Sequence, residues 1–131
     1  MHSALAVLVL LAATQEVEHT KDSLDTVKAS LAKKEAVLVD VREQVEWDRG
    51  HLAEAILLPL SWLKAEAKGD KLAEHAAEKL PANKIVYLHC RSGGRVIPAA
   101  GILKKAGYDV RALSQGFDDL KDAGFPVADK K

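Results

Sequence analysis

The sequence predicts an α/β protein with three layers, in which helices flank a central, mostly parallel sheet of five strands. Short apolar runs of strand length alternate along the chain with stretches whose apolar residues recur every three to four positions, the spacing of an amphipathic helix. The runs at residues 36–41 and 85–89 are almost entirely apolar, as expected of strands that are covered on both faces. Strands that alternate with helices in this way form parallel sheets between helical layers.

Size and composition fit one globular domain. The chain has 131 residues, of which 48% are hydrophobic and 29% are charged. Its 19 Lys and Arg residues balance 19 Asp and Glu residues, so no net positive field favours nucleic acid or an anionic membrane as a partner. The single cysteine excludes an intrachain disulfide and a Cys-rich zinc site.

The amino-terminal residues form a separate segment. Residues 4–13 are an unbroken apolar run, which is shorter than the ~20 residues of a transmembrane helix but matches the hydrophobic region of a secretory signal. We therefore expect residues 1–13 to be a signal peptide or the remnant of a leader, the domain to cover residues 14–131, and no stable membrane span. The protein is then exported or periplasmic. If the run instead forms a buried helix or strand, the protein is cytoplasmic.

The first half of the domain is predicted to alternate strands and helices. Leu24, Val27 and Leu31 recur at helical spacing. Gly50 ends a short helix, and Pro59 stops a brief strand. The elements are, in order, an edge strand at residues 17–19, a helix at 21–33, a buried strand at 36–41, a helix at 43–49 and a strand at 55–58.

The second half continues the alternation. Ser61 and Asp70 are expected N-caps of two helices, because their side-chain oxygens accept backbone N–H groups. Gly69 and Gly107 each end a helix, and Pro81 stops another. The elements are, in order, helices at residues 62–68 and 71–80, a buried strand at 85–89, a helix at 94–105, a strand at 110–113 and a helix at 117–122.

One loop concentrates the residues that carry chemistry. Cys90 follows a buried strand and opens the sequence Cys90-Arg91-Ser92-Gly93-Gly94-Arg95, and ligands of open α/β sheets bind beyond the carboxyl ends of strands. The two glycines allow the loop to turn its N–H groups inward, the next helix directs its N-terminus at the same point, and two arginines add positive charge. All of these features stabilise an anion, and the nearest anion is the thiolate of Cys90.

The loop therefore predicts a nucleophilic cysteine in an anion-binding cradle. Cys90 is the expected catalytic residue. The expected substrate-binding or loop residues are Arg91, Ser92, Gly93, Gly94 and Arg95. The alternative that Cys90 is only a small core residue is the usual interpretation of an isolated cysteine, but it does not explain two arginines and two glycines beside it.

Asp40 and Arg42 are predicted to support this site. Asp40 ends a buried strand, where its carboxylate orients loop backbone, pairs with an arginine, or is simply a turn residue. Arg42 reaches the rim of the site or pairs with Glu46 at a helical spacing, and we favour the pair with Glu46. His19 is expected to be a solvated side chain.

The loop at residues 90–95 resembles the active-site loop of the rhodanese, or sulfurtransferase, family. Other segments resemble the family's in the same order, and the likeness covers roughly residues 16–128. These segments are Asp40-Val41-Arg42-Glu43, Gly50-His51-Leu52, Ala55-Ile56 with Pro59, Ala99-Ala100 with Leu103, Gly107-Tyr108, Gly116-Phe117 and Ala123-Gly124-Phe125-Pro126-Val127. The sequence departs from the family's pattern at Val96, Ala53-Glu54, Gln115 and Leu120.

The resemblance implies a single-domain rhodanese fold and a covalent persulfide on Cys90. The Cys90 thiolate attacks the outer sulfur of a donor such as thiosulfate and releases sulfite, and the sulfur then passes to cyanide or to the thiol of a small molecule or an acceptor protein. Backbone N–H groups of residues 91–95 hold the persulfide, and Arg91 and Arg95 attract the anionic donor. No metal or organic cofactor is implied.

Two other functions are alternatives. Cysteine phosphatases and arsenate-reductase-like enzymes are the first, but the phosphatase loop places five residues between cysteine and arginine, whereas four separate Cys90 from Arg95. The shorter loop predicts a smaller cradle, better suited to a sulfur atom, and it contains no acidic residue to protonate a leaving alkoxide. The second alternative is a non-catalytic binding module, against which the cysteine and the loop arginine both argue.

Overall fold

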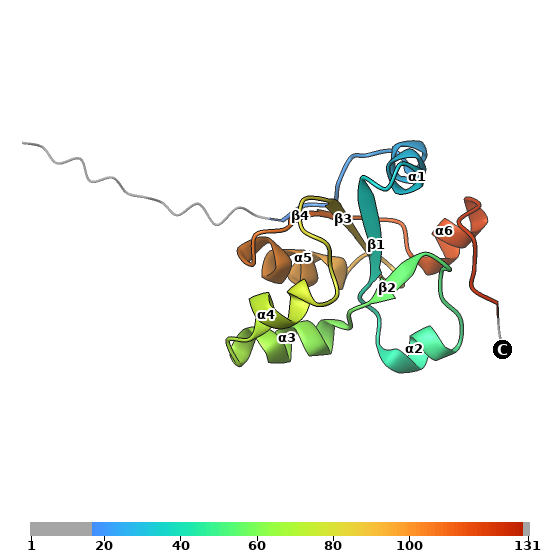
Figure 1. The fold of residues 1–131 in the computed structure, drawn as a ribbon. Helices are drawn as coiled ribbons and strands as arrows, with labels where there is room; N and C mark the ends of the chain where they lie inside the picture. Colours follow the sequence, from blue (N-terminus) through green and yellow to red (C-terminus); the bar gives the residue numbers. More distant parts are fainter. Residues whose placement is uncertain (1–16, 130–131) are drawn as a thin grey trace, which may run out of the picture.

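Residues 17–129 form a four-stranded parallel sheet with helices on both faces (Figure 1). The structure, a computed structural model, describes these residues. The strand order is β2-β1-β3-β4, and every neighbouring pair is parallel. The elements are α1 (Leu24–Ala32), β1 (Ala36–Asp40), α2 (Gln44–Asp48), β2 (Ala55–Leu57), α3 (Leu60–Lys68), α4 (Leu72–Ala77), β3 (Ile85–His89), α5 (Val96–Lys105), β4 (Asp109–Ala112) and α6 (Phe117–Asp122).

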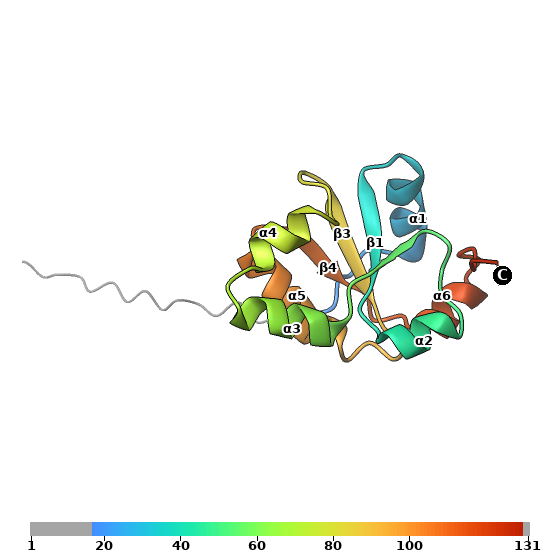
Figure 2. The ribbon, with the colours of Figure 1, turned by 60° about the horizontal axis from the view of Figure 1, so that its bottom comes forward.

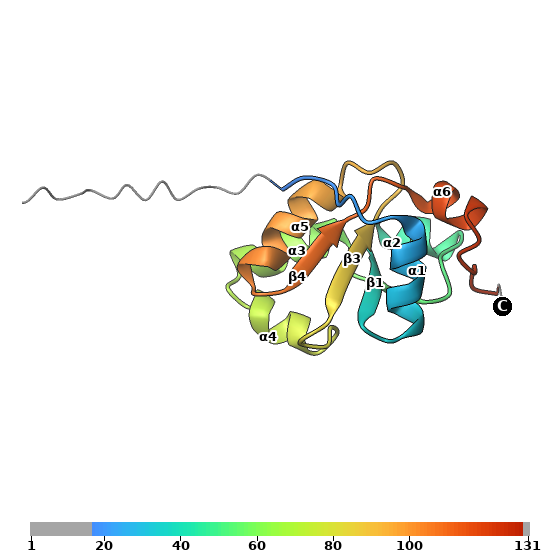
Figure 3. The ribbon, with the colours of Figure 1, turned by 90° about the horizontal axis from the view of Figure 1, so that it is seen from above.

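Two layers of helices enclose the sheet. Helices α3, α4 and α5 lie on one face, and α1 and α6 lie on the other (Figures 2 and 3). Because successive side chains of a strand point to opposite faces, Val39 and Leu88 pack into one core with α3 and α5, whereas Leu38 and Tyr87 pack into a second core with α1 and α6. Both faces of β1 and β3 are therefore buried. The predicted three-layer α/β fold is confirmed.

The prediction of a fifth strand is wrong. His19 makes a single parallel bridge to Ala112, and the N–H of Thr20 donates to Ala112 O at 2.7 Å. The chain then turns towards Ser23, whose side chain caps α1. A single bridge is too short to count as a strand, although this segment lies along the edge of β4.

Two predicted helix caps are also wrong. Ser61 lies inside α3, and its hydroxyl donates to Glu43 Oε1 at 2.5 Å instead of capping the helix. The N–H of Leu60 donates to Val41 O, so a contact with the chain just beyond β1 fixes where α3 begins. Asp70 has a left-handed backbone with φ of 61°, and α4 begins without a side-chain cap. The other predicted strands and helices are present, with small shifts of their ends.

The fold does not test the amino-terminal prediction. Residues 4–13 lie outside the described residues, so a signal peptide at residues 1–13, and the export that depends on it, stay predictions. Within residues 17–129, no helix is both long and apolar enough to cross a membrane.

Candidate active site

The carboxyl edge of the sheet brings the predicted site residues together. Strands β1 and β3 are neighbours, and Asp40 pairs in register with His89, the last residue of β3. Arg42 and Cys90 therefore leave adjacent strands at the edge where parallel α/β sheets bind ligands. The loop at residues 90–95 connects β3 to α5, and α2 and α6 lie beside it (Figure 2).

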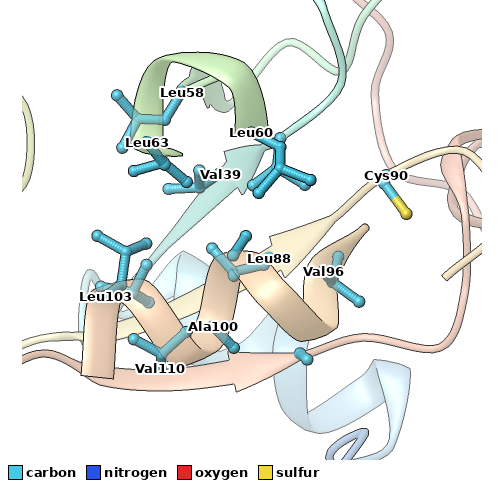
Figure 4. Packing of buried hydrophobic residues seen from close by; sticks show 14 of the residues in the cluster. Val39, Leu58, Leu60, Leu63, Leu88, Cys90, Val96, Ala100, Leu103 and Val110 are labelled. Atoms are coloured by element: carbon cyan, nitrogen blue, oxygen red, sulfur yellow. The ribbon is translucent and has the colours of Figure 1, made fainter. Parts of the chain in front are cut away.

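Cys90 is buried, and its sulfur accepts a hydrogen bond from its own loop. The residue is 1% exposed, and the N–H of Gly93 donates to Sγ at 3.1 Å. Figure 4 shows Cys90 at the end of the core between the sheet and α5, with its sulfur turned away from Leu60. A backbone N–H group is a directed donor, and such donors bind anionic acceptors more strongly than neutral ones. The loop thus places a backbone donor directly at the sulfur of Cys90.

Two glycines let this loop pack against the segment that follows β4. Gly93 has φ of 89°, and a Cβ atom there would lie 2.8 Å from Ser114 O. A Cβ atom on Gly116 would lie 1.8 Å from Arg91 O, closer than any side chain tolerates. The backbone of residues 114–116 therefore shapes the loop around Cys90.

The two loop arginines have different surroundings. Arg91 is exposed, whereas Arg95 makes a bidentate ion pair with Glu46 of α2, with N–O distances of 2.6 and 2.9 Å. Chiefly because of this pair, and also through a hydrogen bond from the N–H of Glu43, the pKa of Glu46 falls from 4.5 to about 2. The predicted Arg42–Glu46 pair is wrong, because the packing of α2 against the loop offers Glu46 the guanidinium of Arg95.

Asp40 and Arg42 form a buried ion pair. Asp40 is fully buried and Arg42 is 5% exposed. The Nε and Nη2 atoms of Arg42 donate to the Asp40 carboxylate over distances of 2.9 to 3.1 Å, and Nη2 also donates to Gly50 O at 2.7 Å. The guanidinium lies 4.4 Å from the centre of the Phe117 ring. Of the roles that the sequence left open for Asp40, the structure shows two. Its carboxylate pairs with the Arg42 guanidinium, which ties β1 to α6 and to the end of α2, and it also accepts the backbone N–H of Arg42 at 2.9 Å.

A small charged cavity opens beside the loop. Its volume is about 170 Å³, and its lining residues are Arg42, Glu46, Arg49, Arg91, Phe117 and Asp118. Arginine side chains hold small oxyanions through charge-assisted hydrogen bonds. Because Asp40 balances the charge of Arg42 and Arg95 balances that of Glu46, the groups of this lining that suit an anionic ligand are Arg49 and Arg91. Ser92 and Gly94 of the loop are exposed. A larger cavity of about 590 Å³ lies at the amino ends of β3 and β4, at the opposite edge of the sheet from Cys90.

His89 is fully buried next to these groups. Its Nδ1 atom lies 3.2 Å from Cys90 O, and since a carbonyl oxygen only accepts, Nδ1 carries the proton. Nε2 then has no hydrogen-bond partner among the described residues, and it lies 3.7 Å from Asp40 Oδ2. Burial lowers the pKa of His89 below its usual 6.5 and outweighs the opposing charge of Asp40. His89 is therefore neutral in the folded protein at neutral pH.

We expect the protein to lose stability below about pH 6.5 because of His89. The unfolded chain takes up a proton at the usual pKa of 6.5, whereas the folded chain resists it. The contribution of neutral His89 to the free energy of unfolding is therefore fully present above pH 6.5. It falls as the pH is lowered, by at most about 1.4 kcal/mol per pH unit. Urea unfolding between about pH 8 and about pH 5 measures this loss.

The His89→Asn variant is the control for this loss, because asparagine keeps a donor near the Nδ1 position but does not titrate. All other histidines are retained, so the difference between the two pH profiles isolates His89. The variant is expected to lose less stability than the wild type over the same range. Equal losses in both proteins would assign the effect to other groups.

Further residues at the site were not predicted from the sequence. Arg49, Phe117 and Asp118 line the cavity, and His19 bonds the loop, since its Nε2 atom lies 2.6 Å from Gly93 O. His19 is exposed, as expected, but it is not only solvated. No sequence pattern marks this contact, because 74 positions separate its two residues. The described residues contain no group of three or more His, Cys, Asp or Glu side chains placed to hold a metal ion.

Comparisons with known proteins identify relatives of the chain. The "Probable adenylyltransferase/sulfurtransferase MoeZ" of Mycobacterium tuberculosis is 38% identical over 79 residues, which is 60% of this chain and 18% of that protein. The "Uncharacterized protein YqhL" of Bacillus subtilis is 34% identical over 85 residues, which is 64% of this chain and 60% of that protein. The chain thus spans less than a fifth of the length of MoeZ.

Solved structures share the fold. The human single-domain sulfurtransferase TSTD1 matches with a TM-score of 0.62 at 21% identity, over 76% of this chain and 92% of that chain. Protein hp1203 of Helicobacter pylori matches with a TM-score of 0.56 at 32% identity, over 75% of this chain and 86% of that chain. The family described as "Rhodanese-like domain" matches residues 23–123, which include every strand of the sheet and the whole loop around Cys90. The chain belongs to the rhodanese-like domain family.

Proposed function

We propose that this chain is a sulfurtransferase that carries a sulfane sulfur as a persulfide on Cys90. The observation that carries the proposal is the hydrogen bond of 3.1 Å from the N–H of Gly93 to Sγ of Cys90, at the ligand-binding edge of the sheet. Membership of the rhodanese-like family supports it. Two similar proteins, TSTD1 and MoeZ, support it as well, because each is named as a sulfurtransferase.

Thiosulfate is the proposed donor. The Cys90 thiolate attacks its outer sulfur, so that a bond forms between Sγ and that sulfur while the S–S bond within thiosulfate breaks, and the electron pair of the broken bond leaves with sulfite. The persulfide keeps the single negative charge of the thiolate, and the N–H of Gly93 stabilises this charge at the site. A cyanide ion or a thiolate then attacks the outer sulfur of the persulfide and restores the Cys90 thiolate.

The cavity beside the loop supports an anionic donor. Arg49 and Arg91 contribute positive charge to its lining, whereas the charge of Arg42 is balanced by Asp40. Arg95 has both terminal nitrogens on Glu46, so its role in the proposal is to fasten the loop to α2. The same pair argues against phosphatase chemistry, because the arginine that would surround a phosphate is engaged by a carboxylate.

We expect the protein to gain the mass of one sulfur atom when it is incubated with thiosulfate, and we expect Cys90→Ser to gain none. Serine preserves the size of the buried side chain but cannot form a persulfide, so the loss is complete. Intact-mass spectrometry measures the adduct, formation of thiocyanate from cyanide measures turnover, and thermal unfolding checks that the variant folds.

Two results would contradict the proposal. Hydrolysis of an aryl phosphate that depends on Cys90 would instead support the phosphatase alternative. The absence of both the sulfur adduct and thiocyanate in the wild type would leave the domain as a binding module.

A further inference from the structure

The amino-terminal segment reaches the loop that holds Cys90. His19 lies 74 positions before Gly93, yet its Nε2 atom lies 2.6 Å from Gly93 O. A carbonyl oxygen only accepts hydrogen bonds, so Nε2 is the nitrogen that donates. Apart from Cys90 itself, His19 is the one described residue whose side chain bonds the backbone of residues 91–95.

His19 is itself held in place by the sheet. Its backbone bridges to Ala112 at the end of β4, and the N–H of the next residue, Thr20, donates to Ala112 O at 2.7 Å. The chain that leaves β4 then packs closely on Gly93. The approach is so close that a Cβ atom on Gly93 would lie 2.8 Å from Ser114 O. The imidazole therefore extends from a fixed backbone and reaches the loop beside a second fixed contact.

Gly93 connects this anchor to the sulfur. Its N–H donates to Cys90 Sγ at 3.1 Å, and its C=O accepts from His19 at 2.6 Å. Only the φ and ψ angles of Gly93 separate the two groups, and a glycine with φ of 89° has no side chain to restrict them. A hydrogen bond on the carbonyl therefore limits the rotations that would carry the N–H away from the sulfur.

We propose that His19 is a positioning residue, which holds Gly93 so that its N–H faces the sulfur of Cys90 during sulfur transfer. The proposal rests on the proposed sulfurtransferase function. His19 is not among the residues that line the small charged cavity beside the loop. Its loss should therefore lower the maximal rate of persulfide formation more than it raises the thiosulfate concentration that gives half of that rate.

Two amide variants test this role. Glutamine places its NH2 group near the position of Nε2, whereas the shorter asparagine does not reach it. We expect His19→Asn to slow persulfide formation about five- to tenfold, the scale of one lost hydrogen bond, and His19→Gln to stay within about twofold of the wild type. Intact-mass time courses at several thiosulfate concentrations measure both kinetic parameters. The Glu18→Ala variant, at the exposed neighbouring residue, is the control and should react like the wild type.

Hydrogen exchange at the Gly93 amide, followed by NMR, gives a readout that does not depend on sulfur transfer. We expect faster exchange in His19→Asn than in His19→Gln. Unchanged exchange of the Gly93 amide in His19→Asn would overturn the positioning role. This test holds even if the wild type transfers no sulfur. That second result would refute the proposed function alone. A wild-type rate in His19→Asn, or equal slowing of the Asn and Gln variants, would also overturn it.

Discussion

Replacing Gly116 with alanine is expected to slow persulfide formation on Cys90 about 100-fold and to lower the free energy of unfolding by about 2–3 kcal/mol. The backbone of Gly116 has φ of −92°, which any residue adopts, so the penalty does not come from conformation. It comes from space, because an added Cβ atom would lie 1.8 Å from Arg91 O and 2.5 Å from Arg91 C. Relief of this clash displaces the loop, and with it the N–H that faces the sulfur.

Gly69→Ala is the matched control. Gly69 also has a negative φ, of −82°, but an added Cβ atom would lie 3.6 Å from its nearest neighbour, Ala65 O, an ordinary contact. This variant should keep the wild-type rate, and its stability should change by no more than about 0.5 kcal/mol. Intact-mass time courses and urea unfolding measure both effects. If Gly116→Ala formed the persulfide as fast as Gly69→Ala, the segment after β4 would not shape the loop.

Arg42→Met is expected to lower the free energy of unfolding by about 3–5 kcal/mol. Methionine fills much of the same space, but the carboxylate of Asp40, which is fully buried, loses the cation that donates to both of its oxygens. Adding Asp40→Asn removes the uncompensated charge and should restore part of the loss. The two substitutions are therefore expected to be strongly non-additive in a double-mutant cycle, as read by urea unfolding.

Arg111→Met provides the comparison at the surface. Arg111 also pairs with carboxylates, those of Asp22 and Asp109, but its side chain is 35% exposed. Solvent screening limits such pairs, so we expect a loss of about 1 kcal/mol or less. Similar losses for Arg42→Met and Arg111→Met would mean that burial does not set the strength of the Asp40–Arg42 pair.

The sequence predicts those parts of the fold that depend on local patterns. The apolar runs of β1 and β3 have few alternatives to burial, so these strands form where they were expected. The edge strand and the caps at Ser61 and Asp70 were wrong, because longer-range contacts decide those positions. Ser61, for example, donates to Glu43 of a different element rather than to its own helix.

The sequence likewise predicts those parts of the site that are contiguous in the chain, but not the contacts between distant segments. The cysteine, the glycines and the arginines are contiguous from Cys90 to Arg95, so the sequence places them in one loop. The partner of Glu46 was predicted from helical spacing to be Arg42, but Arg95 binds it from 49 positions away. Spacing within a helix predicts which side chains lie on the same face. It does not predict that a side chain of another element lies closer to Glu46 than Arg42 does.

By itself, the sequence determined the α/β class, the likeness to a family and the place of the lone thiol at the end of a covered strand. Each of these depends on periodicity or on neighbours a few positions apart. Only the tertiary structure decided that the guanidinium of Arg95 meets Glu46 and that His19 reaches the loop. Hydrogen bonds form over about 3 Å, and only the packing of distant segments at one edge of the sheet sets distances that short.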